Sequence, residues 1–136
     1  MKDIAAGESA SVSFRVAESM QAAFDGRLIH PVLSTAWLVH HLEWASRLVL
    51  EPALGPGEEG VGVGVDIRHL GPAPVGEQVQ VQATAVEQRE GLLICDVRAE
   101  CRGACVATGR VFQAILDRGR LRETRTAGSP ASNGEE

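Results

Sequence analysis

One long apolar segment, LSTAWLVHHLEWASRLVL at residues 33–50, constrains the fold of this chain more than any other feature. When the segment is wound at 3.6 residues per turn, its apolar side chains cover almost the whole circumference of a helix. A helix that is apolar nearly all round is a buried one. Ser34 or Thr35 is a suitable N-cap residue, and Pro52 follows the segment and ends it. The rest of the chain must therefore wrap around this helix.

Strand patterns occupy most of the remaining sequence. A short alternating run lies at residues 11–16, and four further runs follow the helix at residues 61–69, 79–85, 93–100 and 105–116. Most of these runs alternate polar and apolar residues, which is typical of half-buried antiparallel strands. Residues 17–30 are mixed in character, and we expect an irregular or short helical segment there with a turn at Asp25-Gly26.

The order of elements is therefore strand, long buried helix and four consecutive antiparallel strands. A sheet with one apolar face needs a cover, and a helix that is apolar on every side needs a sheet around it. The sequence predicts an α+β protein with the hotdog fold, in which a five-stranded antiparallel sheet wraps around one long buried helix. A single protomer leaves a sheet edge and part of the helix poorly covered, so we expect a homodimer formed by edge pairing.

The length and the charge of the chain narrow its organisation and its partners. Its 136 residues make one ordinary domain, which we assign to residues 1–123, and residues 124–136 are expected to form a disordered tail. The net charge of −5 gives no reason to expect a nucleic-acid partner. The N-terminus lacks the apolar stretch of a signal peptide, and no run approaches the roughly 20 apolar residues that span a bilayer. We therefore expect a soluble cytoplasmic protein with no membrane partner.

The sequence offers no convincing set of metal or cofactor ligands. Cys95, Cys101 and Cys105 form no CxxC pair and have no His at ligand spacing, so we interpret them as structural thiols. His40 and His41 are adjacent on the helix and diverge by about 100°, so they cannot share one metal ion. The stretch GVGVD does not match the dinucleotide-binding fingerprint. We expect neither a metal nor a cofactor.

The two faces of the run at residues 61–69 differ in character. By alternation, one face carries Val61, Val63, Val65, Ile67 and His69. Gly62 and Gly64 fall on the opposite face, where their lack of side chains indicates close approach by another backbone or by a ligand. The inward ring of His69 suits a hydrogen-bonded core residue as well as an acid–base catalyst, and alternation alone favours the core residue.

Glu43 and Thr35 are the other candidate catalytic residues, and each has an ordinary structural interpretation. Glu43 could pair with Arg47 one turn further along the helix, or it could serve as a general base beside an acyl carbonyl. Thr35 could be a plain N-cap. If both residues were fully helical, they would lie roughly 12 Å apart along the helix axis. A shared site therefore requires Thr35 in the cap or the preceding loop.

A family resemblance raises the weight of these three residues. The segments STAWLVHHLEWA and GVGVDIRHLGPAPVGEQVQVQATAV resemble the thioesterase family typified by fluoroacetyl-CoA thioesterase, and the resemblance covers residues 34–117. Thr35 lies eight residues before Glu43, and His69 lies 26 residues after it, as in that family. Pro74 and Gly76 complete the family's motif around the His.

The resemblance implies a homodimer that hydrolyses acyl-CoA thioesters at sites near the subunit interface. It implies that Thr35 is the nucleophile or the hydroxyl that positions water, and that His69 is its acid–base partner. Glu43 would be the carboxylate that activates or orients these groups. It also implies that the backbone of Gly62 lies beside the thioester.

Two positions depart from the family pattern and bear on substrate binding. Gln113 stands where the family's last strand usually carries an Arg that helps hold the substrate. An uncharged amide cannot make the charge-assisted bonds of an Arg. Ile29 stands where the fluoroacetyl-specific members have an aromatic gate. We therefore expect a different short or bulkier acyl group, carried by CoA or by protein-bound pantetheine.

Two other functions compete with thioester hydrolysis. A hotdog enoyl-thioester hydratase needs an Asp and a His at D-x4-H spacing, which Asp25 and His30 have, although the Asn-Pro expected beside them is missing. A non-catalytic module that binds an acyl thioester is the second alternative. Gln113 in place of Arg favours that module, whereas the intact set of Thr, Glu and His argues against it.

Overall fold

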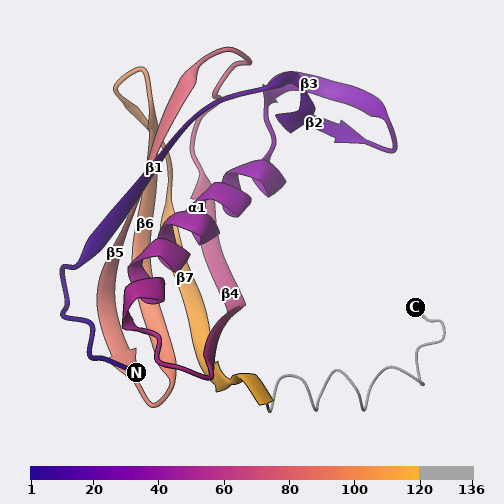
Figure 1. Ribbon diagram of the computed structural model, residues 1–136. Coiled ribbons are helices and arrows are strands. Elements are labelled where there is room, and N and C mark those ends of the chain that lie inside the picture. Colours follow the sequence, from indigo (N-terminus) through magenta and orange to yellow (C-terminus); the bar gives the residue numbers. More distant parts are fainter. Residues whose placement is uncertain (120–136) are drawn as a thin grey trace, which may run out of the picture.

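The computed structural model describes residues 1–119 and consists of a twisted sheet with one helix across its inner face (Figure 1). In chain order the elements are β1 (Ser9–Arg15), the 3₁₀ helix η1 (Glu18–Met20), β2 (Gln21–Phe24), β3 (Arg27–Leu33), α1 (Thr35–Leu50), the 3₁₀ helix η2 (Glu51–Ala53), β4 (Glu58–His69), β5 (Gln78–Arg89), β6 (Leu92–Cys101) and β7 (Ala104–Asp117). The main sheet has five strands in the order β1-β5-β6-β7-β4, and all its neighbours pair antiparallel. The expected five-stranded sheet and single long helix are confirmed. The tail proposed for residues 124–136 lies outside the described residues.

The start of α1 is fixed by a side-chain cap. Ser34 is the N-cap residue, and its Oγ accepts a hydrogen bond of 3.1 Å from the backbone N–H of Trp37. Such a bond satisfies one of the N–H groups that the first turn of a helix leaves without an intrahelical acceptor. Thr35 is therefore the first helical residue and not the cap, so its hydroxyl is free for other partners.

The helix is buried on one side only. Leu38, Leu42 and Ala45 are completely buried against the sheet. On the opposite side, Trp37 and Trp44 leave 37% and 49% of their surfaces exposed. A single five-stranded sheet thus covers one flank of the helix and leaves the other open, which confirms the expectation that one protomer leaves part of the helix poorly covered. No helix among residues 1–119 is long and apolar enough to cross a membrane.

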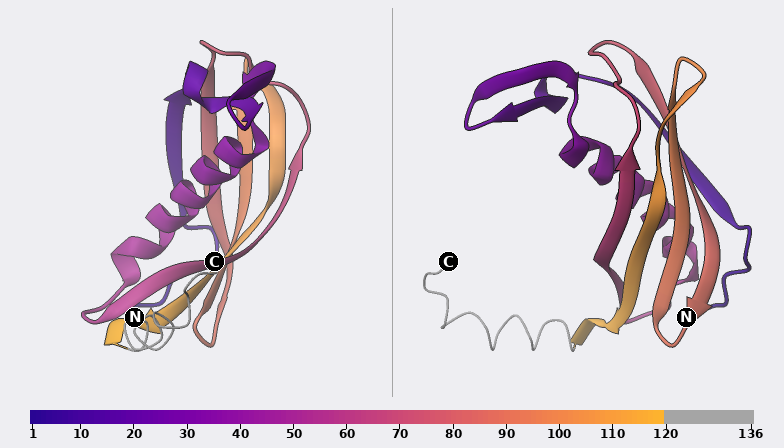
Figure 2. Two further views of the ribbon diagram at one scale, coloured as in Figure 1. Left: turned by 90° about the vertical axis from the view of Figure 1, so that its right-hand side faces the viewer. Right: turned by 180° about the vertical axis from the view of Figure 1, so that it is seen from behind.

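Before the helix, an irregular or short helical segment was expected at residues 17–30; the short 3₁₀ helix η1 lies there, but a hairpin follows it from Gln21. Strands β2 and β3 pair antiparallel and project away from the main sheet as a two-stranded arm (Figure 2). The predicted turn at Asp25-Gly26 is confirmed, with positive φ values of 53° and 76° that suit a two-residue hairpin turn. Phe24, Leu28 and Ile29 on this arm are exposed. Because only the end of β3 at Leu33 packs into the core, the rest of the arm lacks the alternation that marks the other strands.

A β-bulge at Val63 changes which residues of β4 face the helix. Gly62 pairs with Gln113 and Gly64 pairs with Phe112 on β7, so Val63 is left without a partner between them. An extra residue of this kind reverses the alternation beyond it. Gly62 consequently lies on the same side as His69, and the expectation that they occupy opposite faces is wrong. An ideal Cβ built on Gly62 would lie only 2.5 Å from Oε2 of Glu43 on the helix.

Candidate active site

The first turn of α1 meets the end of β4 through a direct side-chain contact. Oγ1 of Thr35 lies 2.9 Å from Nδ1 of His69, which is hydrogen-bond distance. His69 is the last residue of β4 and pairs with the buried Ala107 of β7, so its ring is turned toward the helix as predicted. The Ser34 cap in turn fixes the position of Thr35. Two rigid elements therefore hold the hydroxyl and the imidazole together.

The imidazole of His69 is half-buried, and this burial favours its neutral form. Burial, as the main cause, lowers the pKa of His69 below its usual value, and the backbone of Gly71 partly opposes this shift. Nε2 of the ring is buried without a hydrogen-bond partner among residues 1–119. Unpaired buried polar atoms are rare and concentrate where chemistry takes place. A neutral ring beside a hydroxyl is able to accept its proton.

A small open pocket lies beside this pair. Its volume is about 340 Å³, and its lining consists of Thr35, His69, Leu70, Gly71 and Pro72. The backbone N–H groups of the first turn of α1 are directed toward the N-terminal end of the helix and carry partial positive charge. This end of the helix is thus suited to a carbonyl oxygen that becomes negative during reaction.

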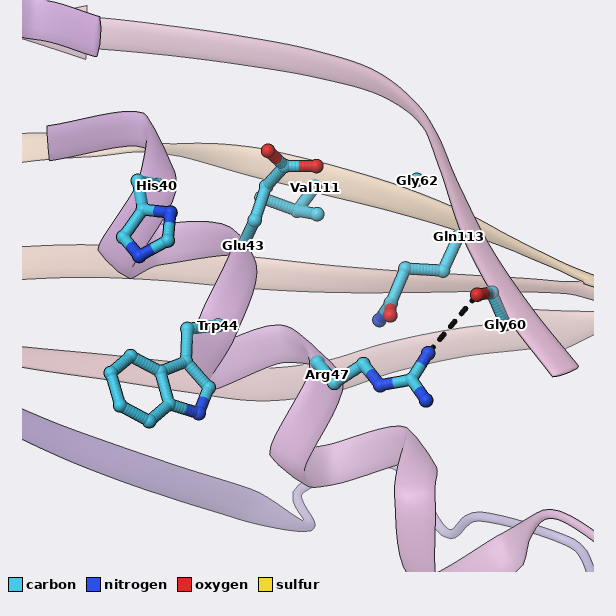
Figure 3. A pocket seen from close by; sticks show the side chains of 8 residues that line it. All are labelled: His40, Glu43, Trp44, Arg47, Gly60, Gly62, Val111 and Gln113. Atoms are coloured by element: carbon cyan, nitrogen blue, oxygen red, sulfur yellow. Dashed lines mark hydrogen bonds between the residues drawn. The ribbon is translucent and has the colours of Figure 1, made fainter. Parts of the chain in front are cut away.

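Glu43 lines a second cleft, between the middle of α1 and the sheet (Figure 3). The cleft has a volume of about 290 Å³ and is lined by His40, Glu43, Trp44, Arg47, Gly60, Gly62, Val111 and Gln113. Glu43 is exposed, and its carboxylate lies over Gly62, which leaves room for it because it has no side chain. Gly62 is approached closely, but the approaching group is the Glu43 side chain and not the other backbone or the ligand that was expected.

The expected pair between Glu43 and Arg47 does not form. Arg47 instead bonds Glu51 through Nε at 2.9 Å, Glu59 through Nη2 at 2.8 Å, and the carbonyl oxygen of Gly60 through Nη1 at 3.0 Å. Among residues 1–119, no hydrogen bond or ion pair engages the carboxylate of Glu43. The guanidinium of Arg47 thus binds Glu51 and Glu59 in place of Glu43. The carboxylate of Glu43 therefore stays available for a ligand.

Gln113 brings a buried amide to the same cleft. Only 4% of its surface is exposed, and its Nε2 donates a hydrogen bond of 3.0 Å to the backbone carbonyl of Ser46. Sequence reasoning had singled out Gln113 but had missed His40 and Arg47 as lining residues. Their spacing was a usable signal, since they lie about one turn before and one turn after Glu43 on the same helix.

The structure joins two of the three candidate catalytic residues within one chain. Thr35 and His69 are in contact, whereas Glu43 lies in a cleft whose lining shares no residue with theirs. Because Thr35 is the first helical residue, it stands roughly 12 Å from Glu43 along the helix axis. Ile29 lines neither pocket; it lies on the exposed arm.

The residues of the hydratase alternative are not brought together. Asp25 occupies the tip of the hairpin, whereas His30 lies on β3, where it pairs with Ala22. Three residues of strand separate His30 from the turn, which corresponds to roughly 10 Å. Both side chains are exposed and lie outside the two pockets. A substrate could not engage an acid and a base from this pair at one carbon atom.

The adjacent helix histidines occupy different environments. His41 is buried, stacks on Phe14 with ring centroids 3.5 Å apart, and bonds the carbonyl of Trp37 through Nδ1. His40 is exposed, and its ring is perpendicular to that of His41. Within the described part of the chain, no group of three or more His, Cys, Asp or Glu side chains is arranged to hold a metal ion.

The known proteins that this chain resembles are thioesterases or proteins with the hotdog fold. A family model described as FlK, fluoroacetyl-CoA-specific thioesterase, matches residues 16–119. A hypothetical protein of Thermus thermophilus, a thioesterase superfamily member, is 31% identical and superposes with a TM-score of 0.95 over 99% of this chain and 100% of that chain. The fluoroacetyl-CoA thioesterase FlK is 20% identical, with a TM-score of 0.84 over 93% of this chain and 98% of that chain. A hot-dog-like protein from Thermanaerovibrio acidaminovorans is 21% identical, with a TM-score of 0.82 over 96% of this chain and 94% of that chain. No curated protein sequence matches. The similar solved structures confirm the predicted hotdog fold.

Proposed function

The chain belongs to the FlK family of fluoroacetyl-CoA-specific thioesterases, and on that premise we propose that it hydrolyses a short-chain acyl-CoA with Thr35, Glu43 and His69 as its catalytic set. Membership of the family makes the chain an acyl-thioester hydrolase. The observation that carries the proposed catalytic set is the 2.9 Å contact between Thr35 Oγ1 and His69 Nδ1. A threonine hydroxyl becomes a useful nucleophile when an adjacent base takes its proton.

The contact between Thr35 and His69 supports two chemical routes. In the first, the Thr35 oxygen attacks the thioester carbonyl carbon while its proton passes to His69, and the same proton then leaves with the thiolate when the carbon–sulfur bond breaks. Water then hydrolyses the acyl-threonine. In the second route, the hydroxyl positions a water molecule, and the oxygen of this water attacks the carbonyl carbon while one of its protons passes to Glu43. That proton then leaves with the thiolate when the carbon–sulfur bond breaks. The first route needs the ring nitrogen of His69 to be free of a proton, which the lowered pKa of His69 favours.

The distance between Thr35 and Glu43 leads us to propose a site shared by two subunits. Roughly 12 Å of helix separates them, so they cannot both touch one small acyl group within one chain. A second copy related by a two-fold axis could bring its own Glu43 to the Thr35 and His69 of the first copy. Exposed apolar side chains lie where such a copy would pack, namely Trp37 and Trp44 on α1 and Val65 on the edge strand β4. The proposed enzyme is therefore a homodimer.

The substrate that we propose differs from fluoroacetyl-CoA. Ile29 replaces the aromatic gate, and the amide of Gln113 replaces the charged Arg at the cleft. The carrier in the proposal is CoA, and protein-bound pantetheine shares the thioester arm that such a cleft would hold. Because acyl-CoA thioesters are used inside the cell, the proposal includes a cytoplasmic location.

Three variants test the proposed catalytic set. We expect His69→Ala and Glu43→Ala each to lower kcat by on the order of 10²-fold or more, because each removes an acid–base or orienting group. Thr35→Ser should keep much of the activity, since it keeps the hydroxyl. His30→Ala and Glu18→Ala are matched controls, because both residues are exposed and lie outside the two pockets. The assay follows release of free CoA thiol from acetyl- and butyryl-CoA.

The same assay decides between the competing functions. Near-normal turnover in both His69→Ala and Glu43→Ala would show the catalytic set to be wrong. Loss of activity in His30→Ala, together with hydration of crotonyl-CoA, would favour the hydratase. Tight binding of thioesters without any release of CoA would favour a binding module.

A further inference from the structure

Gln113 places a buried polar group at the floor of the cleft that holds Glu43. It lies on β7 opposite Gly62 of β4, and glycine has no side chain to cover it. Directly paired residues on neighbouring strands have their Cβ atoms about 5 Å apart. The Glu43 carboxylate lies over Gly62, and the Gln113 side chain lines the same cleft (Figure 3).

The orientation of this amide is fixed by its partner. Nε2 of Gln113 lies 3.0 Å from the backbone carbonyl oxygen of Ser46, and a carbonyl oxygen only accepts hydrogen bonds. The amide nitrogen must therefore face Ser46, and the remaining atom is Oε1, which is an acceptor. Among residues 1–119 no group donates a hydrogen bond to Oε1. The buried amide thus offers the cleft an acceptor that lacks a donor.

The charges around the cleft disfavour an anionic ligand. The one guanidinium in its lining, that of Arg47, is bonded to the carboxylates of Glu51 and Glu59. Two negative charges thus surround one positive charge, and the Glu43 carboxylate adds a third negative charge. Nη1 of Arg47 also donates a hydrogen bond to the carbonyl oxygen of Gly60, so the guanidinium has few donors left for a substrate carboxylate.

From these contacts we propose that the preferred acyl group is short and uncharged and carries a hydrogen-bond donor, most simply a hydroxyl, that binds Oε1 of Gln113. This inference rests on the proposed function, in which Glu43 stands beside the thioester carbonyl. The cleft extends from Glu43 to Arg47, one helical turn or about 6 Å further along the axis, which a short acyl chain covers. In this proposal, a hydroxyl group on the third carbon of such a chain is the group that donates to Oε1 of Gln113.

Four substrates of nearly equal size test this preference. Butyryl-CoA has no polar group on its acyl chain, 3-hydroxybutyryl-CoA adds a donor, acetoacetyl-CoA has a ketone that only accepts, and succinyl-CoA adds a charge. We expect kcat/KM to be about 3- to 10-fold higher for one enantiomer of the hydroxy compound than for butyryl-CoA, the value of one hydrogen bond to a buried neutral acceptor. Acetoacetyl- and succinyl-CoA should be poorer substrates than butyryl-CoA.

The variant Gln113→Met keeps the length of the side chain and removes its acceptor. The ratio of kcat/KM between the hydroxybutyryl and butyryl substrates should then fall to about 1, because a thioether accepts hydrogen bonds only weakly. Equal use of the two substrates by the wild-type protein would overturn the inference without any variant. A preference for acetoacetyl- or succinyl-CoA would do the same, as would an unchanged ratio in Gln113→Met.

Failure of the proposed function gives a different result. In that case none of the four thioesters releases CoA, whatever its acyl group. Calorimetric binding of butyryl- and 3-hydroxybutyryl-CoA to the His69→Ala variant then tests the same preference without turnover. A several-fold lower Kd for the hydroxy compound supports the inference, and equal Kd values overturn it.

Discussion

Gly62→Ala tests the role of Glu43 without touching its carboxylate. A Cβ at position 62 would lie 2.5 Å from Glu43 Oε2, whereas ordinary contact begins at 3.4 Å, so the carboxylate must move by about 0.9 Å. A displacement of about 1 Å in a catalytic group can cost on the order of 10²-fold in rate. We therefore expect kcat on butyryl-CoA to fall by between about 10- and 100-fold. The flexible, exposed Glu43 side chain absorbs the clash, so the free energy of unfolding should stay within about 1 kcal/mol of wild type.

The same strand supplies a matched control. An ideal Cβ on Gly64 would lie 3.5 Å from Cδ1 of Phe112, which is ordinary van der Waals contact, and this position faces away from the cleft. Gly64→Ala should therefore keep near-normal turnover. Steady-state kinetics by thiol release give kcat, and thermal unfolding gives Tm for both variants. Equal activity in Gly62→Ala and wild type, or equal losses in the two alanine variants, would refute the reasoning.

A double-mutant cycle separates the clash from a general effect of the new methyl group. Aspartate is one methylene shorter than glutamate, so Glu43→Asp withdraws the carboxylate from the added Cβ. If the clash is the cause, Gly62→Ala should cost little further activity in a Glu43→Asp background, and the two effects will not be additive. Simple additivity would show that the methyl group acts on the substrate and not through Glu43.

Two further predictions concern the shared site and the pH dependence. If Thr35 and His69 of one subunit work with Glu43 of the other, an equimolar mixture of His69→Ala and Glu43→Ala that has exchanged subunits should regain about one quarter of wild-type activity. Half of the dimers are then mixed, and each mixed dimer holds one intact site of two. A mixture no more active than the two variants alone contradicts a shared site. Because burial lowers the pKa of His69 and the neutral ring is the active form, kcat/KM should stay constant as pH falls to the usual histidine value of about 6.5 and decline only below it. A pH profile with its acid midpoint above that value would show that a different group titrates.

The helix and the four strands that follow it could be predicted from the sequence because each buries apolar surface with a clear period. The helix is apolar on almost every side, which also predicted that the sheet of one chain would leave part of it uncovered. The exposed Trp37 and Trp44 agree with that prediction. The β2–β3 hairpin was missed for the opposite reason. The apolar side chains around its tip, Phe24, Leu28 and Ile29, are exposed, so burial imposes no alternation on them. The Asp25-Gly26 turn was the remaining signal, and it marked the hairpin correctly.

The candidate site was harder to predict from the periodicity of the sequence than the fold was. Nothing in the periodicity of the chain distinguishes Thr35 from a cap residue, and the family spacing first linked it to His69. The partners of Arg47 could not be predicted, because Glu59 approaches it from a strand 12 residues further along the chain. Helix geometry gave the separation of Thr35 from Glu43 only conditionally: eight residues at 1.5 Å each give roughly 12 Å if both residues are helical. The expected shared site required Thr35 in the cap or the preceding loop, whereas Ser34 is the cap and Thr35 is helical.

The bulge at Val63 explains how one strand can serve both parts of the proposed site. Gly62 and His69 are seven residues apart, an odd number, so in a regular strand their side chains would lie on opposite faces. Either the imidazole would then face away from Thr35, or position 62 would face away from Glu43. One extra residue between Gly62 and Gly64 shifts the alternation by one and turns both positions toward the helix. The open space beneath Glu43 and the contact between Thr35 and His69 therefore depend on the same local irregularity, which no periodic reading of the sequence could contain.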